Sequence, residues 1–202
     1  MITTTLNRIR AHGPCRAGWE KLLAGLGKTA PDDEPLPFAR IVEINGIDDA
    51  LWCCRAEPQH EREWRLFAVF CARQVQHLMT DPCSIAAINA AERHANGQAT
   101  NGELADAAYA ARSAAWAAAW TAALGEAADA ADAYAVKWAA WSAADSAAVA
   151  AYGAARSAAD SAAVAAYGAA RSAAWAAAAD SAAGVAAWAA QKAEFLRIVE
   201  AA

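Results

Sequence analysis

Four side chains of metal-binding types lie within 24 residues in the first half of this sequence: Cys71, His77, Cys83 and His94. Zinc sites usually contain pairs of ligands only a few residues apart, and these four do not form such a pair. Cys71 also falls on an apolar helical stripe, where a thiol packs as a small hydrophobe. Catalysis by a Cys–His pair has no supporting local motif. We therefore expect no metal site, no cofactor and no catalytic residue.

Carboxylates occur in pairs at Asp32-Asp33-Glu34, at Asp48-Asp49 and at Asp129 with Asp132. The first group lies in a proline-rich loop and the second at an expected helix start, where carboxylates act as caps. Like charges on one helix face repel each other, so we expect the third pair to face water. The sequence has no glycine-rich phosphate loop. These patterns do not indicate an enzyme.

A mixed face of basic, polar and aromatic side chains extends from Arg55 to His77. The simplest interpretation is a solvated helix face, but arginine and tryptophan are also enriched in protein interfaces. We take this segment as the candidate partner-binding surface, with seven residues: Arg55, His60, Arg62, Trp64, Arg65, Arg73 and His77.

Aromatic side chains recur through the second half, and their simplest role is to form the core of that half. If part of the row is exposed, it becomes a set of anchors for a partner, because tryptophan and tyrosine dominate binding hot spots. The row consists of Trp116, Trp120, Tyr134, Trp138, Trp141, Tyr152, Tyr167, Trp175 and Trp188.

The overall composition excludes several classes of protein. The net charge of −5 does not indicate a nucleic-acid binder, which would carry a basic surplus. The five cysteines are odd in number and include the adjacent pair Cys53-Cys54, which argues for reduced thiols. Charges interrupt every long apolar run, and the N-terminus lacks the apolar core of a signal peptide. We expect a cytoplasmic protein without a membrane span.

The elements that would position these side chains are all helical. Pro14 and Gly27 bracket a first helix, and residues 28–37 form a loop. A short helix from Phe38 should end at Asn45-Gly46, and Asp48 or Asp49 should cap the next one. A helix is predicted over Glu61–Met79, with an apolar stripe of Trp64, Phe67, Cys71, Val75 and Leu78. The next helix should run from Asp81-Pro82 to Asn96-Gly97. Thr100 and Glu103 have the spacing of a capping box, which would open the alanine-rich part.

The sequence becomes alanine-rich after Leu104 and contains an internal repeat, since Asp145–Ala159 is identical to Asp160–Ala174. Repeated glycines at Gly153 and Gly168, together with one-residue slips between related fragments, favour short helices over one long rod. We predict an all-α fold with residues 1–100 as a mixed helical domain. Residues 101–202 would form a solenoid-like or compact array packed on it as one structural unit.

One resemblance to known proteins rests on residues 48–108, which read DDALWCCRAEPQHEREWRLFAVFCARQVQHLMTDPCSIAAINAAERHANGQATNGELADAA and are followed by Ala/Trp/Arg repeats. This segment resembles a group of uncharacterised alanine-rich proteins of phages and prophages. More loosely, it is similar to helical domains of bacterial immunity proteins, in which an AERHANG-type turn precedes alanine-rich helices. The resemblance implies a non-enzymatic role in binding host or defence proteins, and it implies no catalytic residues.

The sequence therefore favours a non-enzymatic protein-binding module, a phage or prophage accessory or anti-defence protein of inhibitor or immunity type. The alternative is a small-molecule binding protein that stacks a nucleotide-like ligand between tryptophan and arginine side chains. The support for it is that Arg112, Arg156 and Arg171 recur beside aromatic residues. Self-association through the alanine-rich faces is also open.

Overall fold

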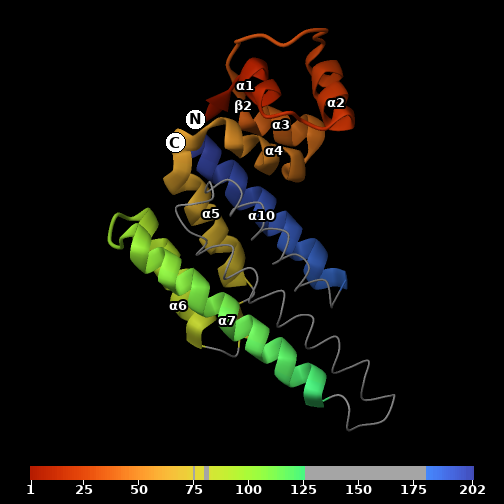
Figure 1. Ribbon diagram of the computed structural model, residues 1–202. Coiled ribbons are helices and arrows are strands. Elements are labelled where there is room, and N and C mark those ends of the chain that lie inside the picture. Colours follow the sequence, from red (N-terminus) through yellow and green to blue (C-terminus); the bar gives the residue numbers. More distant parts are fainter. Residues whose placement is uncertain (75, 80–81, 126–180) are drawn as a thin grey trace.

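The computed structural model describes residues 1–74, 76–79, 82–125 and 181–202 (Figure 1). Within these residues the protein has eight α-helices, three 3-10 helices and one antiparallel pair of two-residue strands, so the expected all-α class is confirmed. The strand pair joins β1 (Thr3–Thr4) to β2 (Leu36–Pro37). No helix among the described residues has the length and apolar character needed to cross a membrane.

Four short helices form the N-terminal part, at the top of Figure 1: α1 (Leu6–Ala11), α2 (Arg16–Leu26), α3 (Phe38–Asn45) and α4 (Ile47–Cys53). Gly27 ends α2 in the left-handed conformation with φ of 67°, as the sequence predicted. The predicted cap of α4 is wrong. Gly46 takes that position, and Asp48 and Asp49 lie in the first turn instead, where carboxylates interact favourably with the helix dipole.

The middle of the chain forms an antiparallel helix pair. After η1 (Cys54–Ala56) and η2 (Pro58–His60) come α5 (Glu61–Gln74), η3 (Gln76–Leu78) and α6 (Pro82–Ala95). Trp64, Phe67 and Cys71 of the predicted stripe are fully buried. The helix ends at Gln74 and not at Met79. The chain must reverse before Pro82 so that α6 can pack along α5, and the tighter η3 turn begins that reversal.

The alanine-rich half opens with the predicted capping box. The Thr100 N–H donates to Glu103 Oε2 at 2.8 Å, and the Glu103 N–H donates to Thr100 Oγ1 at 3.2 Å. The two described helices that follow are α7 (Asn101–Gly125) and α10 (Ser181–Ala201), with 25 and 21 residues. They are longer than the short helices we expected, because alanine has the highest helix propensity, and Gly184 lies inside α10 without ending it. The repeat at 145–174, with Gly153 and Gly168, lies outside the described residues, as does the Asp129–Asp132 pair.

One hydrophobic core joins the two ends of the chain. Phe195 of α10 lies 6.2 Å from Phe38 of α3 and 5.4 Å from Phe67 of α5, measured between ring centroids. The Ile2 N–H donates to the Val199 carbonyl at 2.7 Å, so the termini lie side by side (Figure 1). Leu104 at the start of α7 belongs to the same core, and α7 packs on α6. The last helix is therefore an integral part of the N-terminal fold.

Candidate functional site

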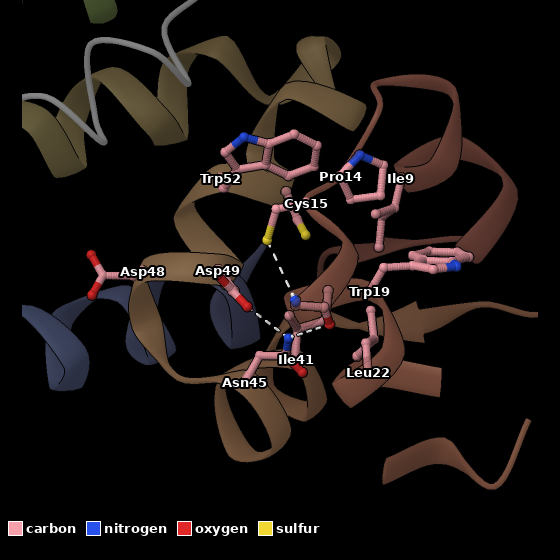
Figure 2. Close-up of a pocket in the computed structure, with 12 residues that line it drawn as sticks. Ile9, Pro14, Cys15, Trp19, Leu22, Ile41, Asn45, Asp48, Asp49 and Trp52 are labelled. Atoms are coloured by element: carbon pink, nitrogen blue, oxygen red, sulfur yellow. Dashed lines mark hydrogen bonds between the residues drawn. The ribbon is translucent and has the colours of Figure 1, made fainter. Parts of the chain in front are cut away.

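A pocket of about 210 Å³ opens among the four N-terminal helices (Figure 2). Its twelve lining residues come from α1, from the residues just before α2, and from α2, α3 and α4. Most of the wall is apolar or aromatic, with Asp49, Asn45 and the Cys15 thiol on one side. The full set is Ile9, Pro14, Cys15, Gly18, Trp19, Leu22, Ile41, Asn45, Asp48, Asp49, Trp52 and Cys53.

Helical spacing explains why these residues share one cavity. The N-cap residue Cys15 lies three or four positions before Gly18 and Trp19 of α2, and Leu22 lies three or four positions after them, so all four share one face of that helix. Ile41 and Asn45 repeat that spacing on α3, and Asp49, Trp52 and Cys53 repeat it on α4. The pocket therefore lies where three helix faces meet.

A hydrogen-bonded bridge fixes the polar side of the pocket. Asn45 Nδ2 donates to the Gly18 carbonyl at 2.8 Å and to Asp49 Oδ2 at 2.7 Å (Figure 2). Because both partners are acceptors, the amide of Asn45 can have only this orientation. The Gly18 N–H donates to Cys15 Sγ at 3.4 Å, so the thiol of Cys15 caps the N-terminus of α2. Asp49 is thus held at the wall of the pocket, whereas Figure 2 shows the carboxylate of Asp48 turned away.

Gly18 allows this close approach of α4 to α2. A Cβ atom at this position would lie 2.8 Å from Asp49 Oδ2 and 3.2 Å from Cys15 Sγ, both closer than normal contacts. A side chain at residue 18 would therefore displace the carboxylate or the thiol from the pocket.

The predicted partner-binding residues divide into buried and exposed groups. Trp64 is fully buried, and its Nε1 donates to the Glu57 carbonyl at 3.0 Å. Arg65 is 1% exposed and pairs with Glu61 at 2.5 Å. The prediction that these two side chains lie on a binding surface is therefore corrected. Their positions on the inner side of α5 assign them to the core, as the apolar stripe already indicated for Trp64.

Two of the exposed arginines connect α5 to α6. Arg62 donates to Asn96 Oδ1 at 3.2 Å, and Arg73 donates to Asn89 Oδ1 at 3.2 Å and to Glu92. Arg73 also donates to Gln76 Oε1 at 3.1 Å. We call Arg62 and Arg73, with these acceptors, the α5–α6 edge.

The remaining three predicted residues are Arg55, His60 and His77, and none of them belongs to the α5–α6 edge. The Arg55 guanidinium lies 4.2 Å above the Trp52 ring, and its Nε donates to the Trp52 carbonyl at 2.8 Å. His60 packs edge-on against Trp64 with ring centroids 6.0 Å apart. His77 is exposed in η3. The structure does not bring all seven residues into one surface.

The cysteines differ strongly in accessibility. Burial raises the pKa of the Cys53 thiol to about 12, and it also raises the pKa values of Cys54 and Cys71 well above that of an ordinary thiol. Cys15 is exposed, and Cys83 is partly exposed. In the described ranges, no group of three or more His, Cys, Asp or Glu side chains is placed to hold a metal ion.

The aromatic row of the second half is described only in part. Tyr109 of α7, which precedes the row, is 74% exposed, and Trp188 of α10 is partly exposed. Trp116 and Trp120 lie on α7. Six members lie outside the described residues: Tyr134, Trp138, Trp141, Tyr152, Tyr167 and Trp175. Arg156 and Arg171 lie there too.

No pattern in the sequence predicted the pocket. Asp48 and Asp49 fitted the cap of a helix, and no motif singled out Trp19 or Trp52. The spacing of Asp49 and Trp52 on one face of α4 was a usable signal, but nothing local indicated that α2 would bring Trp19 to the same cavity.

The protein was compared with family models, with curated proteins and with solved structures, and none of these comparisons found a match.

Proposed function

We propose that this chain is a non-enzymatic protein-binding module. The resemblance of residues 48–108 to alanine-rich phage and prophage proteins supports an accessory or anti-defence role of inhibitor or immunity type. In this role the chain binds a host or defence protein and blocks or redirects it.

The observation that carries the proposal is the α5–α6 edge. Arg73 keeps 38% of its side chain exposed while three acceptors on η3 and α6 orient it. Arg62 is 58% exposed and is oriented by Asn96. Arginine is enriched among binding hot spots, and a side chain that is already ordered loses less conformational entropy when a partner binds. The edge therefore presents two positioned guanidinium groups on a pair of packed helices.

The test is affinity capture from bacterial lysate, followed by binding measurements with the purified captured protein. The double variant Arg62→Ala/Arg73→Ala should weaken binding by about thirtyfold, which corresponds to a hot-spot loss of about 2 kcal/mol. Arg40→Ala is the matched control, since Arg40 is an exposed arginine on α3 that pairs with Glu43 at 2.7 Å. Repeated capture without any specific partner, or equal binding by the double variant and the control, contradicts the proposal.

The second candidate is a small-molecule binding protein, whose ligand would occupy the pocket lined by Trp19 and Trp52. Two properties of this pocket count against that candidate. About 210 Å³ is less than the roughly 300–1,000 Å³ of typical small-molecule sites. The Asp49 carboxylate on its wall would also repel a phosphate. A thermal-shift comparison of nucleosides with nucleotides tests this candidate. Stabilisation by nucleotides would support the nucleotide-like ligand that we predicted from sequence, and no stabilisation by either class would remove it.

A further inference from the structure

The polar wall of the pocket offers acceptors, and we propose that the pocket binds a guanidinium group, the side chain of an arginine from a partner protein. The inference rests on the proposed function, because that function supplies the partner. Its chemistry is independent of the α5–α6 edge, which lies on other elements.

The size of the pocket indicates a single side chain. A volume of about 210 Å³ is below that of typical cofactor or drug-sized sites. A long side chain with a flat head group fills such a space, and its apolar stem would contact Ile9, Leu22 and Ile41.

The charge of the pocket indicates a cation. Among the twelve lining residues, all of them described, none is basic, and the acidic side chain that faces the cavity is Asp49, since the carboxylate of Asp48 is turned away (Figure 2). One oxygen of Asp49 accepts the Asn45 amide at 2.7 Å. An ionised carboxylate has about four lone-pair sites, so Asp49 can still accept hydrogen bonds from a ligand. The bridge through Asn45 holds this carboxylate in position before any ligand arrives.

The aromatic walls favour guanidinium over ammonium. Guanidinium is planar, is weakly hydrated and stacks on indole rings, whereas ammonium keeps its water more strongly. Within the protein, Trp52 already stacks with the guanidinium of Arg55 at 4.2 Å. Arg55 itself does not line the pocket, so its head group does not occupy the space beside Asp49 and Trp19.

Cys15 provides a direct readout of occupancy, because this exposed thiol lines the pocket. The test alkylates the full chain with iodoacetamide and follows Cys15 and Cys83 separately by peptide mass spectrometry. N-acetyl-arginine amide is the probe. N-acetyl-citrulline amide, which has the same shape without the charge, is the control. The arginine probe should slow alkylation of Cys15 by about threefold at twice its Kd, should leave Cys83 unchanged, and should act where the citrulline compound does not.

Variants of the two adjacent carboxylates provide the matched comparison. Asp49→Asn, which keeps the shape of the side chain, should abolish the protection of Cys15, whereas Asp48→Asn should retain it because that carboxylate points away (Figure 2). Circular dichroism checks that both variants fold. Equal protection by the citrulline compound, or no protection up to the highest probe concentration at which the chain stays folded, overturns the guanidinium site.

A competition experiment with the captured partner tests the source of the guanidinium. Saturating arginine probe and Asp49→Asn should each weaken partner capture, while Asp48→Asn should not. If the probe protects Cys15 but partner capture is unaffected, the pocket takes a free guanidinium compound and the partner assignment is overturned. If a partner is captured while the probe never protects Cys15, the pocket proposal fails and the proposed function stands. Protection without any captured partner overturns the proposed function and leaves the guanidinium site.

Discussion

The indole ring of Trp64 on α5 stacks on the ring of Phe195 on α10, with centroids 6.1 Å apart and an interplanar angle of 21°. Both side chains are fully buried. Through this contact the last helix of the chain packs on the core formed by α3 and α5. The stability of the N-terminal helices therefore depends on residues near the C-terminus.

We expect Phe195→Ala to lower the free energy of unfolding by about 3–5 kcal/mol, because it removes a ring that fills the core against Phe38, Trp64 and Phe67. Urea denaturation followed by far-UV circular dichroism measures the loss. Lys192→Ala, an exposed position on the same helix, is the control and should change stability little. A loss below about 1 kcal/mol for Phe195→Ala would show that α10 does not support this core.

The buried thiols predict a decrease in stability at alkaline pH. Burial raises the pKa of Cys53 to about 12, and that of Cys54 well above its ordinary value. Between the ordinary thiol pKa and the raised value the folded state binds more protons than the unfolded state, so stability falls as pH rises. Each such thiol should cost about 1.4 kcal/mol per pH unit above the ordinary thiol pKa.

Urea midpoints measured at pH 7 and pH 10 check this dependence. The variant Cys54→Ala should show a shallower decline between the two values than the wild-type chain, since one buried thiol is absent. An identical decline in both proteins would mean that Cys54 ionises as readily in the folded state as in the unfolded state.

The capping box at the start of α7 gives a local prediction. Thr100→Ala removes the acceptor for the Glu103 N–H and should cost about 0.5–2 kcal/mol. Thr29→Ala, in the exposed loop after α2, is the control.

The same box predicts a response to acid. Hydrogen bonds from Thr100 lower the pKa of Glu103. The contribution of the ionised Glu103 carboxylate to folding stability is therefore present above the ordinary carboxyl pKa, and it is lost as the pH falls through the lowered pKa of Glu103. Thr100→Ala should lose less stability than wild type when the pH is taken from 6 to 3, and an equal acid response in the two proteins would contradict the coupling.

The contact between α2 and α3 predicts a steric effect at Gly25. A Cβ atom there would clash with Ile44 Cγ2, so Gly25→Ala should destabilise the fold by about 1–3 kcal/mol despite the higher helix propensity of alanine. Ile44→Ala in the same chain should relieve the clash, so that the double variant is more stable than the two single losses predict. Additive losses would show that Gly25 and Ile44 do not interact.

The sequence determined most of the helices by itself, because their signals are local. The stop at Gly27, the end of α3 before Gly46, the start of α6 at Pro82 and the capping box at Thr100 each depend on neighbours within one or two turns. The burial of Trp64 and Phe67 followed from helical periodicity in the same way.

The pocket could be decided only by the tertiary structure. Trp19 lies on α2, whereas Asp49 and Trp52 lie on α4, and they converge because Gly18 allows these two helices to pack closely. The attachment of α10 to α3 and α5 likewise depends on how rings far apart in the sequence fill one core. The helical pattern specifies which face of each helix is apolar, but not which helix that face will contact. That choice is made by complementary shape and by paired polar groups across the contact, and these exist only once the chain has folded.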